Sequence, residues 1–136
     1  MSKILEKKLE QMTTEEQHLW ALRHTTEHIL HAAMQNLYPK MLKAIGPATT
    51  EGFYFDFDCG EKITNEDFPK IEAEMEKIIK ACLPMLQEFI SPQKAKEIFS
   101  DNPYKLQWLD EIIKRGEKIS IYKMGDLEIE DRKSVV

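Results

Sequence analysis

At 136 residues, the chain has the length of one domain that can bury a hydrophobic core without disulfides or a structural metal. Hydrophobic residues make up 42% and charged residues 32% of it, and no run approaches the ~20 apolar residues of a membrane span. The net charge of -5 argues against a protein that binds nucleic acid through its overall charge.

Neither the N-terminus nor the cysteines indicate an exported protein. Residues 1–8 mix charges and contain no apolar run before a cleavage site, so we expect no secretory signal and a cytoplasmic location. Cys59 and Cys82 lack the close spacing of a zinc ribbon or a redox dithiol and are expected to be reduced thiols. Cys82 follows Ile78 and Ile79, which predicts a place in the core.

The first strong element is a helix that carries all four histidines of the chain. Residues 3–12 are helical in composition, and Thr13-Thr14-Glu15-Glu16 is a capping box that begins a helix ending near Tyr38, before Pro39. Apolar positions recur at three- and four-residue intervals and predict the core face, formed by Leu19, Leu22, Thr26, Ile29, Ala33 and Leu37. His24, His28 and His31 fall on an adjoining face, the expected floor of a cleft.

The remaining elements alternate between strands and helices. Strands are predicted at 42–46 and 53–58, with Phe53, Phe55 and Phe57 on one buried face. A helix capped at residues 64–67 ends before Pro84. A strand at 85–90, helices opened by Ser91-Pro92 and Asn102-Pro103, and a last strand at 118–122 follow.

This order predicts an α+β domain in which helices cover one face of an antiparallel sheet. We expect a single domain over residues 1–136. Within it, residues 1–16 form an N-terminal helical extension, and residues 127–136 form a divergent or truncated tail with no motif.

The chemistry of the histidine pair has several readings. His24 and His28 are four residues apart, so their imidazoles share one helix face. A metal would need a third ligand from elsewhere, and the motif is not His-Glu-x-x-His, because position 25 is Thr and Glu27 is expected to point off that face. A histidine can instead act as a general base or orient a water without metal. A helix surface carrying two histidines without a function is the third alternative.

Several segments together resemble the editing domain of threonyl-tRNA synthetase in residues, order and spacing. They are Arg23-His24-Thr25-Thr26-Glu27-His28-Ile29-Leu30, Leu37-Tyr38-Pro39, Ala44-Ile45-Gly46-Pro47 and Glu51-Gly52-Phe53-Tyr54-Phe55-Asp56. The resemblance extends to about Asp126. It implies the editing-domain fold, also found in alanyl-tRNA editing proteins, and hydrolysis of serine wrongly attached to the threonine tRNA. It further implies tRNA as partner, through its aminoacylated 3′ end, with a synthetase as a further candidate and no membrane.

The resemblance also implies roles for individual residues. His24, His28 and Lys105 would be catalytic, with Lys105 stabilising the developing oxyanion or the leaving tRNA hydroxyl. Gly46, Tyr54 and Tyr104 would bind substrate. No cofactor is required, although the related alanyl-tRNA editing proteins bind zinc with the equivalent pair. In a zinc site here, the ligands would be His24, His28 and, as a third candidate, Asp131.

The sequence departs from the family pattern in two places. The family continues with Asp-x-Cys-Arg-Gly-x-His after the last predicted strand, whereas this chain has Asp131 in place of the Cys and Val135 in place of the His. Phe55 stands where the family commonly has Tyr. These departures leave a second reading, a non-catalytic module that binds tRNA or a synthetase. No ATP-dependent activating core is expected within these residues.

Overall fold

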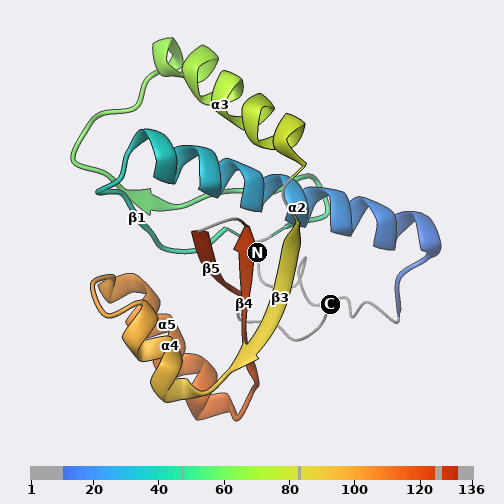
Figure 1. Ribbon diagram of the computed structural model, residues 1–136. Helices are drawn as coiled ribbons and strands as arrows, with labels where there is room; N and C mark the ends of the chain where they lie inside the picture. Colours follow the sequence, from blue (N-terminus) through green and yellow to red (C-terminus); the bar gives the residue numbers. More distant parts are fainter. Residues whose placement is uncertain (1–10, 47, 83, 125–126, 132–136) are drawn as a thin grey trace. The chain divides into compact units, whose positions relative to one another are not determined.

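The computed structural model describes residues 11–46, 48–82 and 84–124, and the backbone of residues 127–131 (Figure 1). The chain divides into two compact units, one up to Ala81 and one from Cys82 onward. Each unit has a hydrophobic cluster of its own. The elements are helices and two small antiparallel sheets, which confirms the predicted α+β class. The prediction of a single domain stays a prediction.

In the first unit, helix α2 (Thr14–Leu37) begins at the predicted capping box. The Thr13 hydroxyl accepts a hydrogen bond from the Glu16 amide at 3.1 Å, and the Glu16 carboxylate accepts one from the Thr13 amide at 3.3 Å. The helix ends before Pro39, as the sequence predicts. Of the predicted N-terminal helical extension, residues 1–10 lie outside the described residues.

The predicted core face of α2 is wrong in its first half. Leu19 and Leu22 are 43% and 56% exposed. The buried positions lie further along the helix and include polar ones, namely Glu27, His28, His31, Ala32, Ala33 and Met34. Helix α3 (Phe68–Ala81) packs along the C-terminal half of α2, so a cluster forms there from Met34, Tyr38, Met41 and Ile71 (Figure 1). The histidine face is therefore an inner face of this unit.

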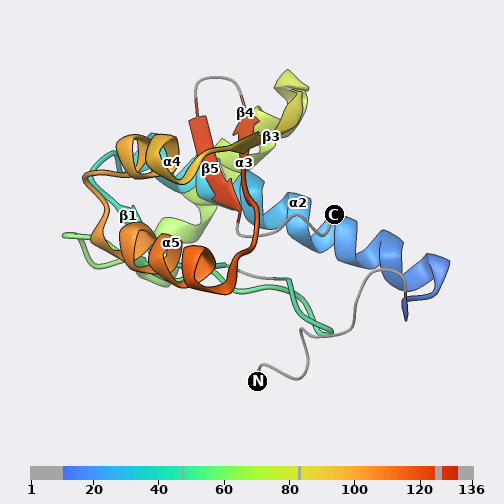
Figure 2. The same cartoon turned by 90° about the horizontal axis from the view of Figure 1, so that it is seen from below.

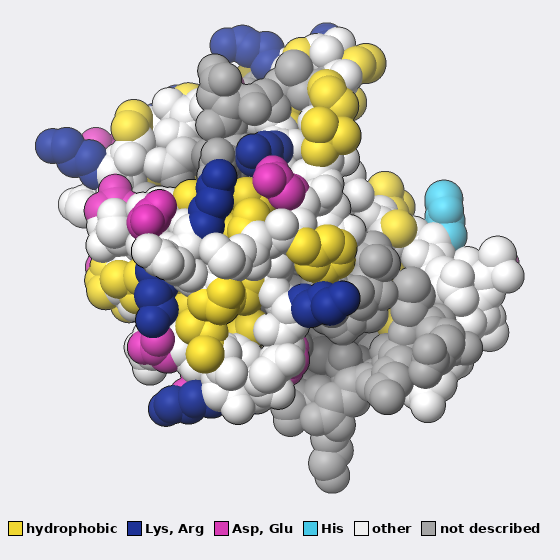
Figure 3. Space-filling view, turned by 60° about the horizontal axis from the view of Figure 1, so that its bottom comes forward, with side chains coloured by type: hydrophobic (Ala, Val, Ile, Leu, Met, Phe, Trp, Pro, Cys, Tyr) yellow, Lys and Arg dark blue, Asp and Glu magenta, His cyan; other side chains and the backbone are white. Residues whose placement is uncertain are grey.

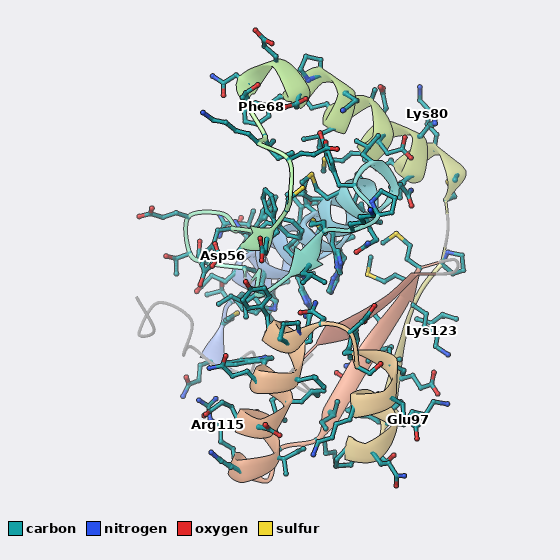
Figure 4. The ribbon with its side chains drawn as sticks, turned by 90° about the vertical axis from the view of Figure 1, so that its left-hand side faces the viewer. Asp56, Phe68, Lys80, Glu97, Arg115 and Lys123 are labelled. Carbon is teal, nitrogen blue, oxygen red and sulfur yellow. The ribbon has the colours of Figure 1, made fainter. Side chains whose placement is uncertain are left out.

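A hairpin follows α2, as predicted, although its regular ladder is short. Strands β1 (Leu42–Lys43) and β2 (Phe57–Asp58) are antiparallel. Two further backbone hydrogen bonds, Ala44 N–H to Asp56 at 2.9 Å and Asp56 N–H to Ile45 at 2.8 Å, continue the pairing. Asp56 is labelled on this hairpin in Figure 4. Phe57 is 37% exposed, so the expected buried row of three phenylalanines is wrong at that end.

A turn of 3-10 helix, η2 (Asn65–Asp67), leads into α3, and the Asp67 carboxylate accepts a hydrogen bond from the Thr64 amide at 2.9 Å. Phe68 and Lys80, labelled in Figure 4, lie near the two ends of α3. Cys82 follows in a left-handed conformation, with φ of 51°. Its side chain is exposed, which corrects the expected core position, because the helix has already ended at Ala81.

The second unit is built on a three-stranded antiparallel sheet of β3 (Met85–Ile90), β4 (Ile119–Met124) and β5 (Leu127–Asp131). Helices α4 (Pro92–Ile98) and α5 (Pro103–Arg115) connect β3 to β4 and lie beside the sheet (Figure 2). They enclose a cluster formed by Ala95, Phe99, Leu109, Ile112, Ile119 and Ile121. The predicted strands and both caps are confirmed.

Strand β5 was not predicted, because residues 127–131 were assigned to a tail. The strand pairs with β4 from Met124 opposite Leu127 to Ser120 opposite Asp131. Pairing depends on the neighbour that a strand meets, so a short charged segment can join a sheet edge without a sequence signal. Among the helices of the described residues, none combines the length and apolar character that crossing a membrane requires.

Candidate functional site

The structure brings His24 and His28 together on α2. Their ring centroids are 4.5 Å apart, with 48° between the ring planes. His28 is buried, at 2% exposure, whereas His24 is partly buried and has Trp20 on its other side at 6.4 Å. The shared face predicted from the four-residue spacing is confirmed.

Glu27 and Lys43 form a buried ion pair next to these histidines. One Glu27 carboxylate oxygen contacts the Lys43 ammonium, and the other lies 3.4 Å from His28 Nδ1. The Glu27 side chain is 1% exposed and that of Lys43 is 5% exposed. The expectation that Glu27 points off the histidine face is therefore wrong.

The hairpin closes over the Glu27 carboxylate at Gly46. A Cβ atom added at Gly46 would collide with that carboxylate and lie 2.9 Å from the Tyr54 carbonyl oxygen. Only a glycine allows this close approach of backbone to side chain. Arg23 joins the hairpin to α2, because its guanidinium donates hydrogen bonds of 2.9 Å to the carbonyls of Thr49 and Thr50. Gly46 and the backbone carbonyl of Tyr54 thus lie close to the Glu27 carboxylate.

The environment of His24 holds it in the neutral form. Burial, and secondly the positive charge of Lys43, lower the pKa of His24 from 6.5 to about 4. At neutral pH the imidazole therefore carries a lone pair and can accept a proton from a water or a hydroxyl. A general base requires this state.

Phe55 lies between the polar residues of the site and an apolar groove, and His31 packs against it. His31 is 5% exposed and its ring lies 5.8 Å from that of Phe55, over which the Lys43 ammonium lies at 5.5 Å. Beyond Phe55 is a half-open groove of about 270 Å³, lined almost entirely by hydrophobic side chains, among them Leu30, Phe57, Phe68 and Met75. With only Glu72 as a polar group, the groove offers no catalytic constellation.

Two of the predicted site residues, Tyr104 and Lys105, belong to the second unit, at the start of α5. The Asn102 side chain accepts hydrogen bonds from both of their amides, at 3.1 and 3.3 Å. Lys105 is buried, at 4% exposure, with its ammonium 5.9 Å from the centre of the Phe99 ring, while Tyr104 is 40% exposed. A buried lysine at this position is not a solvated surface residue.

Within the described residues, the structure provides two of the ligands that a zinc site would need. His24 and His28 supply two imidazoles, which is fewer than the three protein ligands of a catalytic zinc. Within residues 11–46, 48–82 and 84–124, no three His, Cys, Asp or Glu side chains gather as a metal site. The side chain of Asp131, at the end of β5, lies outside the described part, so the three-ligand zinc site stays a prediction.

No protein-family model matches the chain. Individual curated proteins are similar to it. A threonine–tRNA ligase of Thermotoga neapolitana is 50% identical over 107 residues, which cover 76% of this chain and 16% of that protein. Threonine–tRNA ligases of Rubrobacter xylanophilus and Synechocystis are 42% and 44% identical, covering 79% and 84% of this chain and 17% and 19% of their own length. Most of this chain is therefore homologous to one segment of threonine–tRNA ligases, and it spans about a sixth of their length.

Proposed function

We propose that the chain is an editing-type hydrolase that cleaves the ester of serine mistakenly attached to the threonine tRNA. The observation that carries the proposal is the pair of adjacent imidazoles at His24 and His28, with His24 neutral, in a segment homologous to threonine–tRNA ligases. Serine is smaller than threonine, and a binding pocket has limited power to reject a smaller analogue, so a separate hydrolytic step supplies the discrimination.

In the proposed reaction, His24 or His28 accepts a proton from a water as that water attacks the ester carbonyl carbon. The carbonyl oxygen becomes an oxyanion, whose collapse breaks the ester bond, and the protonated imidazole returns its proton to the leaving 3′-terminal oxygen, so that serine and the tRNA hydroxyl are released. Lys105 is proposed to stabilise the oxyanion or the leaving oxygen, because a lysine kept from water interacts more strongly with developing charge. Gly46, Tyr54 and Tyr104 are proposed to line the path of the aminoacyl group.

The proposed partner is the aminoacylated 3′ end of tRNA. On the face that Figure 3 shows, Lys and Arg side chains are interspersed with acidic ones instead of forming a patch of one sign. Together with the net charge of -5, this favours a local contact at the 3′ end over a broad phosphate-binding surface. Further affinity would come from the rest of a synthetase, which is the second proposed partner.

The reaction proposed here requires no metal. Zinc on His24, His28 and Asp131 is the alternative means of activating the water, because a bound zinc lowers the pKa of its water. Metal analysis of the purified protein separates the two routes. Activity at a metal-to-protein ratio near zero, unchanged by added zinc, supports the histidine route.

The test is deacylation of Ser-tRNA(Thr) beside Thr-tRNA(Thr), with His24→Ala and His28→Ala as variants. We expect faster hydrolysis of the seryl ester, reduced about 100-fold or more in each variant, as for loss of a general base. His18→Ala is the matched control, because His18 lies on the same helix and is exposed. Rates no higher than in buffer for either ester would exclude catalysis. Salt-sensitive tRNA binding without turnover would then favour the non-catalytic module.

A further inference from the structure

We infer that the Glu27–Lys43 pair positions His28 for this reaction by keeping its proton on Nδ1 and its lone pair on Nε2. The inference rests on the proposed function for its catalytic consequence, but the state of the imidazole can be measured without it. Glu27 and Lys43 are here positioning residues, which act through His28 and do not contact the reacting atoms.

The first step is the geometry around His28 Nδ1. A carboxylate oxygen of Glu27 lies 3.4 Å from this nitrogen, an electrostatic contact without hydrogen-bond geometry, and both side chains are buried, at 1% and 3% exposure. A negative oxygen at this distance attracts an N–H and repels a nitrogen lone pair, and burial strengthens both effects. The tautomer with the proton on Nδ1 is therefore favoured, which leaves Nε2 as the atom that can accept a proton or a hydrogen bond.

The second step is what holds the carboxylate there. Its other oxygen contacts the Lys43 ammonium, so β1 fixes one end of the group. The backbone of the hairpin closes on the same carboxylate at Gly46, where an added Cβ would collide with it. Glu27 thus has contacts from α2, β1 and the hairpin, and little freedom to turn away from His28.

The third step concerns the reason for burying an ion pair at this position. Such pairs are poor stabilisers, because the cost of removing two charges from water offsets their attraction, and two apolar side chains are often as stable. Glu27 of the pair lies 3.4 Å from His28 Nδ1, and the charge of Lys43 helps to lower the pKa of His24. An effect on the tautomer of His28 and on the pKa of His24 would account for a pair that adds little to stability.

The experiment compares the unmodified chain with the double variant Glu27→Met/Lys43→Met, which removes both charges and keeps similar side-chain volumes. The tautomer of His28 is read at neutral pH from the nitrogen chemical shifts of its ring, assigned with His28→Gln. Deacylation of Ser-tRNA(Thr) is measured in parallel as kcat and KM. The matched control is Glu76→Met/Lys80→Met, which removes an exposed ion pair from α3 in the same unit.

We expect the unmodified chain to hold the His28 proton on Nδ1 and the double variant to show a mixture or the Nε2-protonated form. In the double variant, kcat should fall about tenfold or more with KM unchanged, since positioning affects the transition state and not substrate binding. The control should match the unmodified chain in both measurements.

An Nε2-protonated His28 in the unmodified chain, or an unchanged tautomer in the double variant, would overturn the inference. A shifted tautomer with unchanged kcat would overturn its catalytic part. If the unmodified chain hydrolyses neither ester, the proposed function fails, while the tautomer measurement still decides whether the pair sets the state of His28. Circular dichroism of the double variant verifies that it is folded before either result is read.

Discussion

Glu27 on α2 and Lys43 on β1 contact each other with both side chains almost fully buried, at 1% and 5% exposure. They are 16 positions apart in the chain and join the helix that carries the histidines to the hairpin beside it. Removing one partner from a buried pair leaves the other charge uncompensated in a place that water does not reach. The contact therefore links the stability of this unit to the state of the candidate site.

Lys43→Met should destabilise the fold by about 3–5 kcal/mol, because it leaves the Glu27 carboxylate buried without its cation. Adding Glu27→Met to the same chain should recover most of that loss. Urea denaturation of the two variants measures the difference. Lys80→Met, which breaks an exposed ion pair, should cost no more than about 1 kcal/mol. Equal losses for Lys43→Met and the double variant would contradict the prediction.

Gly46→Ala should destabilise the first unit by about 1–3 kcal/mol, since the new methyl group has to displace the Glu27 carboxylate or the Tyr54 carbonyl. Gly60→Ala is the matched control, because an added Cβ there meets no atom within 4 Å. Thermal unfolding of the two variants gives the comparison. A Gly46→Ala chain as stable as Gly60→Ala would show that this close approach carries no constraint.

Stability should depend on pH through His24. Its pKa is lowered to about 4 in the folded chain, whereas in the unfolded chain it has the ordinary value of 6.5. The unfolded chain therefore binds a proton first, so the contribution is complete above pH 6.5 and is lost as the pH falls through about 4. The loss from this group is at most about 3 kcal/mol.

Urea denaturation between pH 7.5 and 4, compared with His24→Gln, measures this contribution. The difference in stability between the two chains should shrink as the solution is acidified. A difference that stays constant over the whole interval would mean that His24 titrates alike in the folded and unfolded chains.

Asn102→Ala should destabilise the second unit by about 1–2 kcal/mol, because one side-chain oxygen accepts from the amides of both Tyr104 and Lys105 at the start of α5. Asn102→Asp keeps an acceptor at the helix N-terminus and should cost much less. Chemical denaturation of both variants tests this. If Ala and Asp are equally destabilising, the cap is not the source of the loss.

Local features were predictable from the residues alone. The capping box at Thr13 and Glu16 and the Asn102 cap depend on groups three residues apart or fewer, and the structure confirms them. The shared face of His24 and His28 follows from the period of the helix and needs no tertiary contact. The α+β class follows in the same way from the order of periodic segments.

Tertiary packing decided what periodicity leaves open. The sequence of a helix with apolar residues on one face and histidines on the next does not reveal which face other elements cover. In the structure, α3 and the hairpin cover the second half of α2. Glu27 and His28 are therefore buried, while Leu19 and Leu22 are exposed. Lys43 gave no signal as the partner of Glu27, because a strand lysine is ordinarily solvated. The pairing of residues 127–131 with β4 depended on an available sheet edge. The sequence determined the histidine pair, and the long-range contacts determined the charges that surround it.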